Sequence, residues 1–248
     1  MLTETPPLTP AKRAQPVPMS FGQQGIWLLH QTLPDPAAYH WAWSIRFSRR
    51  VEPAKIRRCL GVIQERHEIF RTALGLQAGQ LVQLIAPAQS VPVPWQEMDL
   101  RARSPDQQPA ELRELLATEA RRPFDLARAP LWRVVWIELG GQEQVLALTF
   151  HHSIMDDWSL RLLIHELEQL YAADGQPGPA DLPELSQQYG DLPSGNGSGW
   201  PAQPNQRGRI GGNSSKICRA RSNCPRNWPV GSLRLARAQS TVFNSPVP

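Results

Sequence analysis

The chain has 248 residues, of which 26 are basic and 22 acidic, and its formal net charge is +4. All the acidic residues lie at or before Asp191, whereas eight basic residues follow it. The first 191 residues therefore hold 18 basic against 22 acidic residues, a net charge of −4, and the remainder carries +8. The isoelectric point near 9.3 reflects this remainder, so it does not indicate a nucleic-acid-binding protein.

The chain opens with a Pro-rich leader, residues 1–18. The leader lacks the apolar stretch of a signal peptide, and no segment of the chain is long and apolar enough to span a bilayer, so a cytoplasmic location is expected. Cys59 is the single cysteine before Asp191, and Cys218 and Cys224 have no second cysteine pair near them. The sequence thus predicts neither a disulfide framework nor a zinc site.

The part of the chain that follows the leader predicts two helices, a strand and a hairpin. Residues 20–31 carry apolar side chains at helical spacing, and residues 41–48 alternate between apolar and polar as a half-buried strand does. Pro53 opens a second helix with one apolar face. Two strands at 70–76 and 81–85 then flank the turn Gln-Ala-Gly-Gln, which is typical of a hairpin.

The next part predicts another helix, a second hairpin and a final helix. Residues 110–121 form a helix that ends before Pro123. Strands at 131–139 and 145–150 flank a Gly-Gly turn, and a leucine stripe at helical spacing follows within 160–171. This order of elements predicts a mixed α/β domain, with an open sheet that helices cover on at least one face.

The composition of the chain changes at Asp191, which divides it into two regions. Residues 19–191 are of a suitable size for one domain. Residues 192–248 form a basic tail that is rich in Gly, Pro, Ser, Asn and Arg and shows no helical or strand periodicity. Such a segment buries too little apolar surface to offset its chain entropy, so the tail is expected to be disordered.

The most informative motif runs from His151 to Ser159 and reads His-His-Ser-Ile-Met-Asp-Asp-Trp-Ser. Neighbouring side chains on a strand point to opposite faces, so one of the two histidines faces the core and the other a loop, cleft or channel. A histidine at a strand end can accept or position a proton near neutral pH. Three simpler interpretations stay open: a hydrogen-bonded core histidine, a metal site that uses His152 and Asp156, and aspartates that favour the positive end of the next helix.

Four stretches, in the same order, resemble motifs of the condensation domains of nonribosomal peptide synthetases. Residues 20–27 resemble the opening motif Ser-x-Ala-Gln-x-Arg-Leu-Trp, and residues 66–72 resemble Arg-His-Glu-x-Leu-Arg-Thr. Residues 123–133 contain Pro-Phe-Asp-Leu and Pro-Leu-Trp-Arg, which usually precede the histidine motif. Residues 151–159 resemble His-His-x-x-x-Asp-Gly-Trp-Ser. The resemblance covers residues 19–191 and implies the N-terminal lobe of a chloramphenicol acetyltransferase-like fold.

The resemblance also implies an activity, the formation of an amide bond by acyl transfer. His152 is expected to be catalytic, facing a channel between two lobes and deprotonating or orienting the amine that attacks a thioester carbonyl. His151 is expected to be structural, Asp156 to hold the loop through a buried ion pair, and Arg66 and Arg71 to be structural. Both substrates arrive on phosphopantetheine arms, so the implied partners are carrier proteins and neighbouring synthetase modules. Neither a bound cofactor nor a metal is expected, and neither nucleic acid nor a membrane is an implied partner.

Two positions and one boundary depart from the family pattern. Asp157 replaces a glycine, adding bulk and charge where glycine allows close backbone approach, and Gly25 replaces an arginine. Residues 189–192 resemble the start of the next family motif, Tyr-x-Asp-Phe-Ala-x-Trp, and the match then stops. A frameshift or truncated gene is the expected cause, and an evolved basic tail that binds acidic surfaces is the alternative. The sequence is therefore interpreted as an impaired condensation domain or as a non-catalytic fragment that binds a carrier protein or another module.

Overall fold

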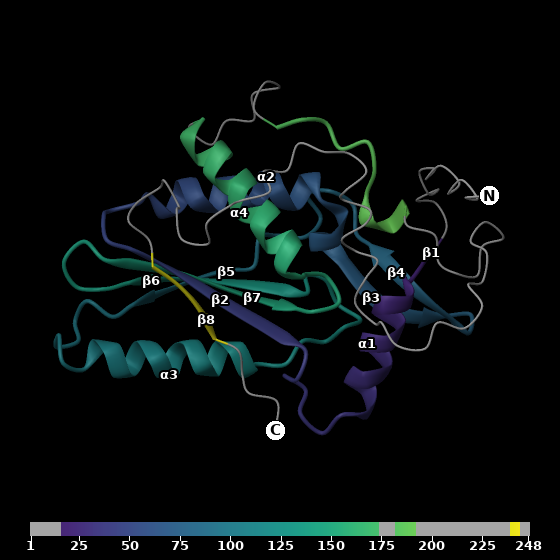
Figure 1. Cartoon of the computed structure of the whole chain (residues 1–248), viewed down its shortest axis with the longest axis horizontal. Helices are drawn as coiled ribbons and strands as arrows, with labels where there is room; N and C mark the ends of the chain where they lie inside the picture. The colour runs from purple at the N-terminus through teal and green to yellow at the C-terminus, as the bar shows by residue number, and fades with distance from the viewer. Residues whose placement is uncertain (1–15, 174–181, 192–238, 244–248) are drawn as a thin grey trace, which may run out of the picture.

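A computed structural model describes residues 16–173, 182–191 and 239–243 (Figure 1). Its larger sheet has five strands in the order β5-β6-β7-β2-β8. Their bounds are Trp95–Asp99 for β5, Trp132–Glu138 for β6, Gln144–His151 for β7, His40–Phe47 for β2 and Gln239–Phe243 for β8. The pair β5 and β6 is parallel, whereas the other neighbours are antiparallel. Strand β7, which ends in the histidine pair, is thus central, as the sequence predicted.

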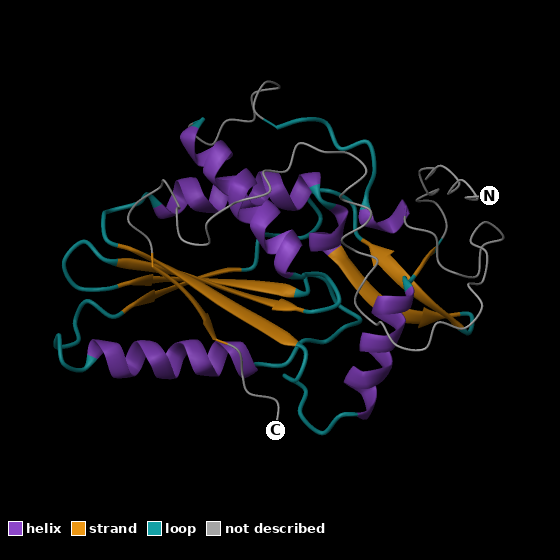
Figure 2. Cartoon of the chain, in the orientation of Figure 1, coloured by secondary structure: helices purple, strands orange, loops and turns teal. Residues whose placement is uncertain are grey.

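A smaller sheet of three strands, in the order β1-β4-β3, lies beside the larger one (Figure 2). Its strands are β1 (Val17–Pro18), β4 (Gln80–Ile85) and β3 (Thr72–Gln77), and the short helix η1 (Glu68–Arg71) precedes β3. The turn residues Ala78 and Gly79 have φ angles of 49° and 77°, which suits a tight two-residue hairpin. The predicted hairpin is therefore present, with a helical turn where its first strand was expected to begin.

Helices cover both faces of the larger sheet (Figure 2). Helices α2 (Pro53–Arg66) and α4 (Asp157–Ala172) lie together on one face, and α3 (Gln108–Arg121) lies on the other. Helix α1 (Phe21–Thr32) lies near the smaller sheet, and the short helix η2 (Tyr189–Asp191) follows α4 in the described chain. The sequence predicted cover on at least one face, and the structure confirms this expectation.

Strand alternation divides the core into two layers. The larger cluster joins α2 and α4 to one face of the sheet, and it includes Leu146, Leu148 and Phe150 of β7. The smaller cluster joins α3 to the other face, and it includes Val145 and Ala147 of β7. Odd-numbered side chains of β7 therefore face the α3 side, and even-numbered ones face α2 and α4. This alternation determines what surrounds each histidine at the end of β7.

Three short strands lie where the sequence predicted none. Strand β5 is short and mostly polar, with exposed residues on both sides, so it lacks the alternation that marks a half-buried strand. Strand β1 lies inside the predicted leader, where Val17 pairs with Gln83 and is buried. Strand β8 lies inside the tail that was predicted to be structureless, and it pairs with the edge of β2. The rest of the tail lies outside the described residues.

Candidate active site

The central strand β7 and its partner β2 bring three histidines together. His151 lies directly opposite His40 in the antiparallel register, and the centroids of their rings are 6.0 Å apart. His30, on α1, lies with its ring 5.1 Å from that of His151. Sequence reasoning missed this cluster because neither His30 nor His40 belongs to a motif, and only the strand register brings His40 to His151.

His151 is fully buried, as one member of the pair was expected to be. The backbone N–H of Ser153 donates to its Nδ1 at 3.3 Å, and the Ser153 hydroxyl lies 2.8 Å from the same atom. Because Nδ1 accepts, the proton of the neutral ring is on Nε2. Burial, with further contributions from His30, His40 and His152, lowers the pKa of His151 from 6.5 to about 3. A ring held neutral and enclosed suits the structural role expected of it.

His152, the next residue, has an exposed side chain. Its backbone N–H donates to the carbonyl of Tyr39 at 2.8 Å, and its Nδ1 lies 2.7 Å from the carbonyl oxygen of Met155. A carbonyl oxygen only accepts, so Nδ1 carries the proton and Nε2 of the neutral ring presents a lone pair. The centroid of the Trp41 ring lies 6.1 Å from that of His152. The structure therefore places an oriented proton acceptor at the end of the central strand.

The two aspartates that follow serve the start of α4. Asp156 is the N-cap, and its Oδ1 accepts from the backbone N–H and the hydroxyl of Ser159 at 2.8 and 2.6 Å. Asp156 is half-buried, and the bonds that the structure gives its carboxylate in the described part of the chain are these two to Ser159 through Oδ1, so the buried ion pair expected from the resemblance stays a prediction. Asp157 occupies the first helical turn and pairs with Arg161 at 2.9 Å, with 69% of its side chain exposed. Its carboxylate thus points outward, and its helical backbone does not require glycine.

The structure identifies partners for both arginines of the Arg66 to Thr72 motif. Glu166 of α4 is 3% exposed and accepts from Nε of Arg66 at 3.3 Å, while its other oxygen lies 2.7 Å from Nε2 of His67. Arg71 donates to the carbonyl of Ala86 and lies 3.8 Å from the carboxylate of Glu68. Glu166 therefore joins α4 to the end of α2, and this 100-residue separation explains why the sequence alone did not reveal the pair.

Arg133 of the Pro-Leu-Trp-Arg segment holds the end of α3 beside His40, one of the three clustered histidines. Arg133 donates to the carbonyls of Glu119 at 2.9 Å and Pro123 at 3.2 Å, and its guanidinium lies 3.9 Å from the centroid of the Phe124 ring. The bond to Glu119 satisfies one of the last carbonyls of α3, and the bond to Pro123 holds the segment just after the helix. The neighbouring carbonyl of Ala120 accepts from Nδ1 of His40 at 2.8 Å. The end of α3 is thereby fixed beside the ring of His40.

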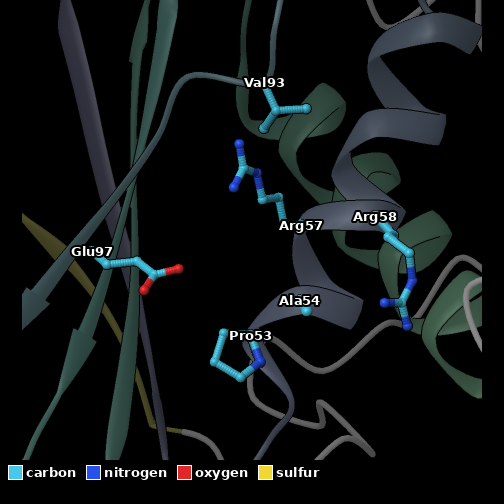
Figure 3. A pocket seen from close by; sticks show the side chains of 6 residues that line it. All are labelled: Pro53, Ala54, Arg57, Arg58, Val93 and Glu97. Atoms are coloured by element: carbon cyan, nitrogen blue, oxygen red, sulfur yellow. The ribbon is translucent and has the colours of Figure 1, made fainter.

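A hollow of about 600 Å³ lies between the start of α2 and β5 (Figure 3). It is lined by Pro53, Ala54, Arg57, Arg58, Val93 and Glu97. Strand β2 begins at His40, which pairs with His151, and runs over eight residues to Phe47. Helix α2 begins shortly after that, at Pro53. Eight extended residues span roughly 25 Å, so the hollow lies at the opposite end of the sheet from the histidines. It is not part of the candidate active site.

The metal interpretation of the histidine motif finds no support in the structure. Within residues 16–173, 182–191 and 239–243, no three His, Cys, Asp or Glu side chains are grouped so that they can hold a metal ion. Asp156, the second ligand of that interpretation, is engaged by Ser159. In the same described part of the chain, none of the helices has the length and apolar character needed to cross a membrane.

The fold and the histidine-bearing strand define a class of protein, and comparison with known proteins confirms it. The family model described as "Condensation domain" matches residues 13–192, so the chain belongs to the condensation-domain family. It is 38% identical over 177 residues to phosphinothricin tripeptide synthetase PhsC of Streptomyces viridochromogenes, covering 71% of this chain and 16% of the relative. It is 33% identical over 201 residues to nonribosomal peptide synthetase kk1B of Curvularia clavata, covering 80% of this chain and 1% of the relative.

Solved condensation domains share the fold. The starter condensation domain of rhizomide synthetase RzmA superposes with a TM-score of 0.58 at 21% identity, over 64% of this chain and 38% of that one. The first condensation domain of the calcium-dependent antibiotic synthetase, in complex with substrate analogue 2a, gives the same values. The chloramphenicol acetyltransferase-like fold predicted from the sequence is therefore confirmed. The chain spans less than half the length of the relatives and solved domains that it matches.

Proposed function

We propose that this chain supplies the histidine-bearing part of a condensation domain that joins a thioester-bound acyl group to an amine. The observation that carries the proposal is the state of His152, whose side chain is exposed and whose Nδ1 is held by the Met155 carbonyl. That bond leaves the Nε2 lone pair available to an incoming amine. Family membership supports the reaction class, because the matched relatives are synthetases of peptides.

In the proposed reaction the amine nitrogen attacks the thioester carbonyl, a C–N bond forms and the C–S bond breaks. The amine must lose a proton, and the sulfur leaves as a thiolate that gains one. Nε2 of His152 accepts the amine hydrogen, which orients the nitrogen lone pair toward the carbonyl or removes the proton. Nδ1 keeps its proton throughout because the Met155 carbonyl can only accept.

The substrates are proposed to arrive on the phosphopantetheine arms of carrier proteins, with no cofactor or metal bound by this chain. Neighbouring synthetase modules are the corresponding partners. The small share of each relative that this chain covers, 16% and 1%, supports work within larger assemblies. Because it spans 38% of the solved condensation domains, a role as a non-catalytic fragment that binds a carrier protein is the second candidate.

The test is amide formation between two carrier-bound aminoacyl thioesters, followed by mass spectrometry. His152→Ala is expected to lower the rate by about 10²–10⁴-fold, the usual worth of a positioned base. His165→Ala, a histidine substitution on α4 outside the motif, is the matched control and is expected to retain activity. Equal turnover by folded His152→Ala and wild type would remove His152 from the mechanism. Carrier binding by the wild type without turnover would favour the non-catalytic fragment.

A further inference from the structure

Helix α1 reaches the histidine loop through one buried side chain, that of Gln23, which is 1% exposed. Its Oε1 accepts from the backbone N–H of Ser20 at 3.1 Å, and its own backbone N–H donates to Ser20 Oγ at 3.2 Å. This reciprocal pair is a capping box at the start of α1. Because a backbone N–H only donates, the pair fixes which end of the Gln23 amide is oxygen. The NH₂ group therefore faces the loop.

The NH₂ group of Gln23 bonds to the peptide unit that follows Ser153, in the loop after the histidine pair. Its Nε2 donates to the carbonyl of Ser153 at 3.3 Å and to Oε1 of Gln83 at 3.5 Å. Ser153 also holds His151 through its own N–H and hydroxyl. One amide thus connects α1, the smaller sheet and the loop that carries both histidines, although Gln23 and Ser153 are 130 residues apart in the sequence.

The ring of His152 depends on the path of this loop. Its backbone is anchored before the loop by Tyr39, and its ring is oriented by the carbonyl of Met155, three residues later. The Ser153 carbonyl lies between these two anchors in the chain. A shift of the Ser153 peptide therefore changes the separation between the His152 ring and the carbonyl that fixes its tautomer.

We propose that Gln23 is a positioning residue for His152. By holding the Ser153 carbonyl, it keeps the loop in the path in which Met155 accepts from Nδ1 and Nε2 retains its lone pair. The expected effect of Gln23 on the reaction rate rests on the proposed function, whereas its expected effect on the tautomer of the His152 ring does not. The two are therefore tested by separate measurements.

Gln23→Glu keeps the size of the side chain but replaces the NH₂ group that donates to the Ser153 carbonyl with an oxygen. The carboxylate can still accept from the Ser20 N–H and retain the capping box, but its second oxygen then faces the Ser153 carbonyl, acceptor against acceptor. The loop is expected to move, and the Nδ1 bond to Met155 to weaken. If the chain forms amides, kcat should fall at least about tenfold with little change in KM, as expected for a misplaced group.

Two control variants disturb the surroundings of Gln23 without reversing its contact with Ser153. Gln83→Met removes the other acceptor of its NH₂ group. Ser20→Ala removes the hydroxyl that caps α1 and lies 2.9 Å from the hydroxyl oxygen of Tyr189. Both are expected to lower the melting temperature while leaving the His152 ring and kcat close to wild type. A control that altered the ring as strongly as Gln23→Glu would overturn the proposal.

The decisive readout is the ¹⁵N NMR spectrum of the His152 ring nitrogens in the full chain. The wild type, in its neutral form, is expected to show a protonated Nδ1 and an unprotonated Nε2, and Gln23→Glu a mixture of both tautomers. If Gln23→Glu does not fold, Gln23→Asn, which is one methylene too short to reach Ser153, should give the same mixture. Wild-type ring signals in either folded variant would refute the positioning role. An inactive wild type with the expected spectra would refute the proposed function alone.

Discussion

Acidification is expected to unfold this protein through its buried histidines. The pKa of His151 is lowered to about 3 and that of His40 to about 4, in both cases mainly by burial, from an ordinary value of 6.5. A lowered histidine pKa in the folded state means that, between the two pKa values, the unfolded chain binds more protons than the folded chain. Folding free energy is therefore lost as the pH falls below 6.5, and the loss continues until the folded pKa is reached.

The size of the effect follows from these values. At pH 5 an unfolded histidine with a pKa of 6.5 is almost fully protonated, whereas His151 and His40 are almost fully neutral. Each group then lowers the free energy of unfolding by about 2 kcal/mol relative to pH 7.5. The two together remove about 4 kcal/mol, a large part of the ~5–15 kcal/mol that stabilises a typical domain.

The assay is urea unfolding at pH 7.5, 6.5, 5.5 and 5, with the free energy extrapolated to water at each pH. His40→Asn keeps a donor for the Ala120 carbonyl but cannot titrate, so it should lose about 2 kcal/mol less than the wild type over this range. His165→Asn, on α4, is the matched control and should follow the wild type. Equal pH dependence in His40→Asn and wild type would show that burial of the histidine cluster does not govern acid stability.

Two further substitutions test how α4 is anchored, at its N-cap and through Glu166 in its middle. Asp156→Ala removes the N-cap and should lower the free energy of unfolding by about 1 kcal/mol, measured by chemical denaturation; a loss of several kcal/mol would instead indicate the buried ion pair expected from the resemblance. Glu166→Ala leaves the largely buried Arg66 without its carboxylate and should cost about 3–5 kcal/mol, so a thermal midpoint within a degree of wild type would contradict the assigned role.

Local patterns explain what could be predicted from the sequence. Period-two alternation in β2 and helical spacing in α2 and α4 depend on neighbouring residues, so those elements were found close to their observed bounds. The same alternation correctly assigned one histidine of the pair to the interior and the other to the surface.

What could not be predicted depends on distant residues. The bond between Gln23 and Ser153 and the pair between Arg66 and Glu166 join segments separated by 130 and 100 residues, and polar side chains give no periodic signal of such contacts. The ion pair expected for Asp156 came from the resemblance, whereas its observed place as the N-cap follows from the local rule that aspartate caps a helix. Edge strands such as β5 were missed because their mostly polar residues are exposed on both faces.

The pairing of β2 with β7 has a consequence for how the chain folds as it is synthesised. His40 pairs with His151, 111 positions later, so β2 leaves the ribosome long before its central partner exists. At a synthesis rate of roughly 5–20 residues per second, that interval is on the order of ten seconds. Throughout it, a segment with two tryptophans, an isoleucine and a phenylalanine has unpaired backbone on both edges. Pairing at such sequence separation is slow to form, so nascent chains should depend on chaperones that shield β2 until β7 emerges.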